Sequence, residues 1–139
     1  MINVHKDDVN GGVQYKDIVT GNVMLDVAQE SYGGVKPAYA VYAANGAISL
    51  YSHTAVITKG TAAALTLAAP TADTHDGIVI TVVSTTAAAH TVTATTIGFN
   101  AGDAASDVGT FGGAIGDGFS FVAYQGEWYV LTNTNVTLA

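Results

Sequence analysis

Short runs of apolar and β-branched residues, separated by turn residues, occupy most of the chain beyond residue 37. The run at 118–124 alternates cleanly, with Phe119, Phe121 and Ala123 on one face. Such alternation is typical of a strand that buries one face. Similar runs lie at 38–43, 47–58, 62–69, 78–84, 90–95, 127–132 and 135–139. No window carries a sustained apolar stripe with helical spacing, so the pattern predicts an all-β fold.

Two dipeptides between these runs have turn character. Asn45-Gly46 separates two apolar runs and predicts a tight β-hairpin, and Gln125-Gly126 predicts a second two-residue turn. Short strands at intervals of roughly 8–12 residues, joined by such turns, are typical of a β-sandwich or barrel. We therefore expect an antiparallel, sandwich-like or barrel-like domain over residues 48–139.

The N-terminal part of the chain is less regular. Turn signals interrupt it at 10–12, 21–22 and 33–34, and the segment 17–30 between them fits either a short strand or a weak helix. We expect residues 1–47 to form an extended arm that requires a partner to fix it.

The stretch 77–102 contains a single ionisable side chain, His90. A membrane span needs about 20 predominantly apolar residues. Residues 78–96 include eight Thr or Ser, which argues against a span. The N-terminus shows no cationic segment followed by an apolar one, so no secretory signal is expected.

Charge is scarce and unevenly distributed. Charged residues make up 11% of the chain, against about 25% in typical domains. Low surface charge suits a subunit buried against copies of itself or a larger body, although an Ala-rich monomer would look similar. The net charge is −7 without any Arg, and all four Lys lie within residues 1–59. Binding to nucleic acid or to anionic membranes is therefore not expected.

The histidines and carboxylates show no metal-binding motif. His90 shares a strand face with Val92 and Ala94, which favours a buried or interface histidine over an ion or pH site on a symmetry axis. Asp73, His75 and Asp76 form the densest polar cluster, and a hairpin loop explains it better than a cation site. The loop acids Asp103, Asp107 and Asp117 leave calcium as a weaker alternative. There is no Cys. We expect no metal and no cofactor.

Catalytic constellations are equally absent from the sequence. Ser84, Ser106 and Ser120 lack the context of an activated nucleophile, and no phosphate-binding glycine motif with a lysine occurs. A polysaccharide hydrolase would need a carboxylate pair, for which Asp73 and Asp76 are the best candidates. We predict no catalytic residues and no enzymatic activity.

Aromatic residues surround the Gln125-Gly126 turn. Tyr124, Trp128 and Tyr129 could stack on sugar rings if they are exposed. Alternatively, Trp128 fills the core while the two tyrosines pack across the hairpin.

Two segments, 65–95 (LTLAAPTADTHDGIVITVVSTTAAAHTVTAT) and 109–139 (GTFGGAIGDGFSFVAYQGEWYVLTNTNVTLA), carry a resemblance. They are similar to the small β-rich modules found on tailed-bacteriophage particles, in head decoration (cement) proteins and in fibre-like appendages. The resemblance implies a tulip-like, trimeric β-domain and a structural role on the outer surface of a virion. Residues 1–47 match no such module.

This resemblance leads to a specific hypothesis. The protein would decorate and stabilise a capsid as a homotrimer that bridges neighbouring copies of the major capsid protein. The N-terminal arm would contact the capsid through Lys6, Lys16 and Lys36, and the trimer would form through apolar faces that contain His90, Val92, Phe119 and Phe121. The alternative is a tail-fibre module that binds a host receptor or glycan through Tyr124, Trp128 or Tyr129.

Overall fold

The computed structural model describes residues 4–9, 12–17, 23–27, 37–100 and 106–139, and the chain forms two compact units, Met1–Pro37 and Ala38–Ala139. The first unit contains β1 (Val4–Val9), β2 (Gly12–Asp17) and β3 (Val23–Val27), which pair in that order as an antiparallel sheet. Where an extended arm was expected, the described strands thus pair with one another. The segment 17–30 contributes a strand rather than a helix.

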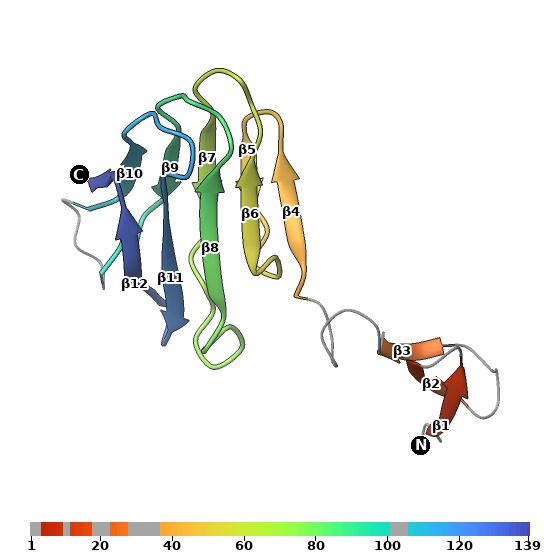
Figure 1. The fold of residues 1–139 in the computed structure, drawn as a ribbon. Helices are drawn as coiled ribbons and strands as arrows, with labels where there is room; N and C mark the ends of the chain where they lie inside the picture. The colour runs from red at the N-terminus through yellow and green to blue at the C-terminus, as the bar shows by residue number, and fades with distance from the viewer. Residues whose placement is uncertain (1–3, 10–11, 18–22, 28–36, 101–105) are drawn as a thin grey trace. The chain divides into compact units, whose positions relative to one another are not determined.

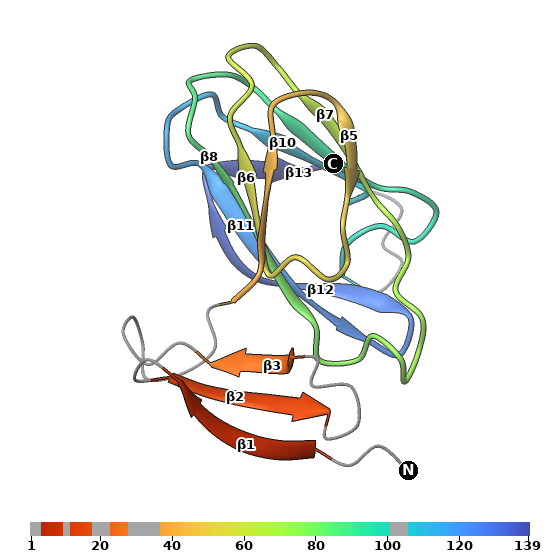
Figure 2. The ribbon, with the colours of Figure 1, turned by 90° about the vertical axis from the view of Figure 1, so that its right-hand side faces the viewer.

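The described residues of the second unit contain ten strands in two five-stranded sheets (Figures 1 and 2). Sheet 1 has the order β12-β11-β8-β6-β4, and sheet 2 has the order β13-β10-β9-β7-β5. Their bounds are β4 Tyr39–Tyr42, β5 Gly46–Ile48, β6 Thr54–Ile57, β7 Ala64–Leu67, β8 Val79–Ser84, β9 Thr91–Ala94, β10 Val108–Phe111, β11 Gly118–Tyr124, β12 Glu127–Thr134 and β13 Val136–Leu138. No helix occurs in the described ranges. The all-β prediction is confirmed.

The direction of the strands differs from the prediction. The chain crosses from one sheet to the other after each of β4 to β8, so that β4, β6 and β8 are parallel neighbours, as are β5, β7 and β9. Figure 2 shows these crossings between the sheets. Antiparallel pairing joins β8, β11 and β12 in sheet 1, and β9, β10 and β13 in sheet 2. Both sheets are therefore mixed, and the expectation of a purely antiparallel sandwich is wrong.

The predicted hairpin at Asn45-Gly46 is wrong for the same reason. The strands on either side, β4 and β5, belong to different sheets. The Asn45 side-chain oxygen accepts hydrogen bonds from Lys59 Nζ (2.9 Å) and from the Ala64 backbone N–H (3.1 Å). These bonds attach the turn to the β6–β7 connection and the start of β7 instead of closing a two-stranded ladder. Because β4 and β5 belong to the sheets, the compact unit begins at Ala38 rather than at residue 48.

The turn at Gln125-Gly126 forms as predicted. Tyr124 pairs with Glu127 across it, and the two turn residues have φ angles of 49° and 83°. Positive φ at both central positions defines a type I′ turn, whose twist matches that of the strands it joins. Glycine suits the second position because it adopts positive φ without steric cost.

The core lies between the two sheets and follows the alternation of the strands. In β8, for example, Ile80, Val82 and Ser84 are buried while the residues between them are more exposed. A series of edge-on or tilted ring contacts runs through this core, with centroids 5.1–6.1 Å apart. Its members are His90, Phe111, Phe119, Phe99, Phe121 and Trp128. Such contacts add to the burial energy of the large rings.

Candidate functional site

His90 lies immediately before β9 and is fully buried. Its Nδ1 accepts a hydrogen bond from the Ala63 backbone N–H (3.0 Å), and its Nε2 lies 3.0 Å from the Thr86 hydroxyl. That hydroxyl donates its proton to the Lys59 carbonyl oxygen (2.7 Å), so the network assigns the ring proton to Nε2. The ring thus joins the crossing loop before β7 to the loop before β9.

The charge state of His90 follows from this environment. Burial lowers the pKa of its imidazole, and the nearby Lys59 ammonium lowers it further. Protonation would also place a proton on Nδ1 and break the hydrogen bond from Ala63. His90 is therefore a neutral structural group, and both of its ring nitrogens are occupied within the chain.

The other three residues proposed for a trimer interface are also internal. Val92, Phe119 and Phe121 are at most 1% exposed in a single chain, and all three belong to the core between the sheets. A side chain that is already covered by its own chain cannot contact another copy. The placement of the trimer contacts at His90, Val92, Phe119 and Phe121 is therefore wrong, because the alternating face that they share points inward.

The polar cluster at Asp73–Asp76 binds other parts of the same chain. The Thr71 backbone N–H donates to His75 Nδ1 (2.7 Å), and the Tyr51 hydroxyl lies 3.2 Å from His75 Nε2. The Gln125 side-chain amide donates to Asp73 Oδ1 (2.9 Å) and Asp76 Oδ2 (2.7 Å). The segment connects β7 in sheet 2 to β8 in sheet 1, so it is a crossing loop and not a hairpin.

Asp117 has a comparable role before β11. Its carboxylate accepts hydrogen bonds from the Ala114 backbone N–H (2.8 Å) and from the Asn135 amide (3.0 Å). These bonds, with the one from Ala114 contributing most, lower the pKa of the Asp117 carboxyl group. Asp103 lies outside the described residues. Within the described part of the chain, no group of three or more His, Asp or Glu side chains gathers as metal ligands would.

The three aromatic residues at the β11–β12 turn have different environments. Trp128 is fully buried, and its indole N–H donates to the Ala68 carbonyl oxygen (3.0 Å). It therefore fills the core, as the alternative interpretation held, and it cannot stack on a sugar. Tyr124 and Tyr129 are exposed on the outer face of sheet 1.

Apart from these two tyrosines, the sequence-based candidates missed this outer face. Its side chains are aligned in rows across the strands. One row contains Thr132, Ser120, Thr81, Thr54 and Tyr39, and the next contains Thr134, Gly118, Val83, Val56 and Val41. Tyr129, Val122 and Val79 form a third. The sequence did contain a signal for this surface, because β8 has apolar residues on both of its faces. Strands that are covered on both sides have such continuous apolar runs.

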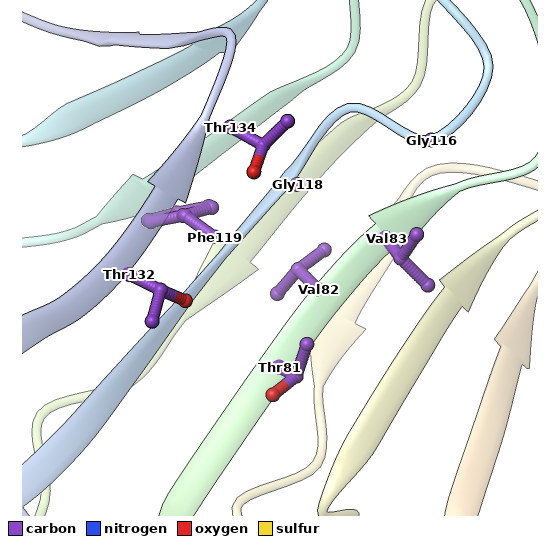
Figure 3. Close-up of a pocket in the computed structure, with 8 residues that line it drawn as sticks. All are labelled: Thr81, Val82, Val83, Gly116, Gly118, Phe119, Thr132 and Thr134. Atoms are coloured by element: carbon purple, nitrogen blue, oxygen red, sulfur yellow. The ribbon is translucent and has the colours of Figure 1, made fainter.

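A shallow hollow of about 150 Å³ opens on this face (Figure 3). It is lined by Thr81, Val82, Val83, Gly116, Gly118, Phe119, Thr132 and Thr134. Gly118 is required there, because a Cβ atom at this position would clash with the Val82 carbonyl oxygen. The lining contains hydroxyl and apolar groups and no ionisable side chain, which suits contact with a neutral surface.

The outer face of sheet 2 has a different chemistry. Its rows contain Ala47, Thr66, Thr93 and Val108, and Ala64, Thr91, Thr110 and Thr137. Hydroxyl groups dominate this face, whereas aliphatic and aromatic groups recur on that of sheet 1.

Of the lysines proposed for capsid contact, Lys6 lies on β1 and Lys16 on β2, while Lys36 is outside the described residues. A helix of the length and apolarity that a membrane crossing requires does not occur in the described ranges. No match to this chain was found among family models, curated proteins or solved structures.

Proposed function

We propose that this protein is a non-enzymatic structural component of a bacteriophage virion. It binds the outer surface of the capsid as a homotrimer and bridges neighbouring copies of the major capsid protein. The similarity of residues 65–95 and 109–139 to decoration modules motivates this proposal. The fold is compatible with it, because a densely paired β-unit presents broad, uncharged surfaces that can pack against other subunits.

The observation that carries the proposal is that the strands of the second unit contain almost no charge and that several described polar groups form hydrogen bonds within the chain. The ten strands of the second unit contain one charged side chain, Glu127. His75, His90 and Asp117 are hydrogen-bonded within the chain and hold loops in place. Polar groups whose hydrogen bonds are all made to neighbouring loops stabilise the fold. This pattern supports an assembly subunit more than an enzyme, which would keep reactive groups free in a cleft.

The N-terminal unit is the proposed attachment region. It forms its own strand pairs and is a compact unit of its own. Three of the four lysines of the chain, Lys6, Lys16 and Lys36, belong to it. Many modest contacts of this kind, repeated over a shell, would give avidity without tight individual binding.

Co-sedimentation with capsids that lack the protein tests this proposal. Replacing Lys6, Lys16 and Lys36 by Gln should weaken capsid binding by about tenfold or more, because three contacts of the attachment region lose their charge. The matched control replaces the same residues by Arg, which keeps the charge and should retain binding. Equal binding of the Gln variant and the original protein would refute the role of the lysines.

Removal of residues 1–37 tests the attachment region as a whole. The remaining chain, Ala38–Ala139, should keep its β-structure by circular dichroism and its trimeric mass, yet fail to sediment with capsids. Retained binding would move the capsid contact to the two-sheet unit. The number of copies per particle, measured on quantitative gels of virions that carry the protein, separates the two locations: hundreds indicate decoration and a few indicate a fibre.

A further inference from the structure

The exposed apolar side chains of the second unit are concentrated on one sheet. Among the described residues, eight large hydrophobic side chains are exposed, and six of them lie on strands of sheet 1. These six are Tyr39, Val41, Val79, Tyr124, Tyr129 and Leu131. The other two, Tyr51 and Ile115, lie in loops, and none lies on a strand of sheet 2. Such a concentration marks an interaction surface.

The register of the strands places apolar side chains of this face in two neighbouring groups. Val122 on β11 pairs with both Tyr129 on β12 and Val79 on β8, so these three side chains lie next to one another. On the same face, toward the opposite edge of the sheet, Val41 on the edge strand β4 pairs with Val56 on β6. Thr81, on the central strand β8, is exposed between these two apolar groups.

The distribution of charge indicates which partner this surface fits. The chain has a net charge of −7, so two copies repel one another at long range. In the second unit, the described carboxylates Asp73, Asp76, Asp107 and Asp117 lie in loops, and Glu127 is at the beginning of the edge strand β12. Two copies that meet through the outer faces of sheet 1 keep these carboxylates at the rim. An acidic chain can therefore bind itself there without burying charge.

The outer face of sheet 2 is also uncharged but is a poorer partner for a second copy. Thr66, Thr93 and Thr110 expose hydroxyl groups, which lose hydration when they are buried without new hydrogen bonds. Sheet 1 presents hydroxyl groups too, but it also exposes large aliphatic and aromatic side chains, whose burial is favourable.

From these observations we propose that the outer face of sheet 1 is the surface through which copies of this chain associate. In the trimer, the three faces are turned toward a common threefold axis, with Thr81 near the middle of the contact. This inference shares the homotrimer with the proposed function but does not depend on capsid binding. Its experiment is made on the purified protein, so its failure is distinguishable from a failure of the decoration role.

The experiment compares two matched substitutions in the full-length chain. Thr81→Glu places a carboxylate on sheet 1, and Thr66→Glu places one on sheet 2. Both positions are exposed, lie within strands and have uncharged row neighbours. Masses are measured by sedimentation equilibrium. The original protein and Thr66→Glu should have three times the 14.1 kDa mass of one chain. Thr81→Glu should associate about 100-fold more weakly, because like charges then face one another.

A second measurement does not require the oligomer to be disrupted. The chain has no Cys, so Thr81→Cys and Thr66→Cys each introduce a single thiol. Thr81 is exposed in one chain, so a second copy that covers this face would protect a thiol placed there. In the oligomer, a bulky maleimide should label Thr81→Cys at least about tenfold more slowly than Thr66→Cys. Dilution to the monomer should remove the difference.

Several outcomes would overturn the inference. A monomeric original protein at all concentrations would exclude self-association through any face. Dissociation by Thr66→Glu but not by Thr81→Glu would place the contact on sheet 2. Protection of Thr81→Cys in a monomer would show that no second copy is needed to cover the face. Equal labelling of both thiols in a stable trimer would show that copies associate elsewhere.

Discussion

Each end of the two-sheet unit contains one histidine whose Nδ1 accepts a hydrogen bond from the backbone of a crossing loop. At one end, His90 accepts from the Ala63 N–H and contacts the Thr86 hydroxyl. At the other end, His75 accepts from the Thr71 N–H and contacts the Tyr51 hydroxyl. The side chains use the same chemistry, but their surroundings differ.

Burial distinguishes the two sites. The hydrogen bond between Ala63 and His90 is fully buried, and the ring also makes an edge contact with Phe111 (centroids 5.9 Å apart). The bond between Thr71 and His75 is only partly buried, and the edge partner of His75 is Tyr51, which is 70% exposed. Water can therefore replace the ring as the acceptor for the Thr71 N–H but not for the Ala63 N–H. The contribution of each histidine to stability therefore depends on its surroundings more than on its bonds.

The largest expected effect comes from His90→Ala. The substitution leaves the buried Ala63 N–H without an acceptor and creates a cavity beside Phe111. We expect a loss of about 2–4 kcal/mol in the free energy of unfolding, measured by urea denaturation. His90→Asn is the control, because its side-chain oxygen can still accept from Ala63, and it should lose clearly less. Equal losses for the two variants would show that the hydrogen bond contributes little.

The second prediction concerns pH. Burial lowers the pKa of folded His90 below its ordinary value of 6.5, so the unfolded chain binds more protons as the pH falls through that value. The contribution of His90 is therefore fully present above pH 6.5 and declines below it, by at most about 1.4 kcal/mol per pH unit, until the folded pKa is reached. Unfolding free energies between pH 8 and pH 5 should decline less steeply for His90→Asn than for the original protein. Parallel profiles would contradict a buried neutral imidazole.

Local patterns in the sequence identify most strands but not their partners. The alternation at 118–124 coincides with β11, and Gln125-Gly126 forms the expected turn. Pairing direction is not encoded in that alternation, because a strand alternates in the same way beside parallel and antiparallel neighbours. The parallel partners β6 and β8 are separated by a crossing into sheet 2 and back, so no short segment of sequence contains the pair.

The strand β10 was missed for a packing reason. β10 lies within a Gly-rich and Ala-rich stretch, and its Gly109 occupies a position on the core side. The Phe119 ring fills that space, since a Cβ atom on Gly109 would lie 3.0 Å from Phe119 Cζ. The apolar side chain that would have indicated a strand at Gly109 therefore comes from β11, and β10 itself lacks it. Alternation likewise showed that His90 and Phe119 lie on apolar faces, but only the three-dimensional fold shows that the second sheet covers those faces.

The smallest of these effects is expected for His75→Ala, and it completes the comparison of the two ends. The Thr71 N–H is partly exposed, so water can take the place of the ring and the loss should be about 1 kcal/mol. Urea denaturation under the conditions used for His90→Ala gives the direct comparison. A loss as large as that of His90→Ala would mean that the loop before β8 is as tightly packed as the buried end. In that case burial around the histidine would not explain the difference between the two sites.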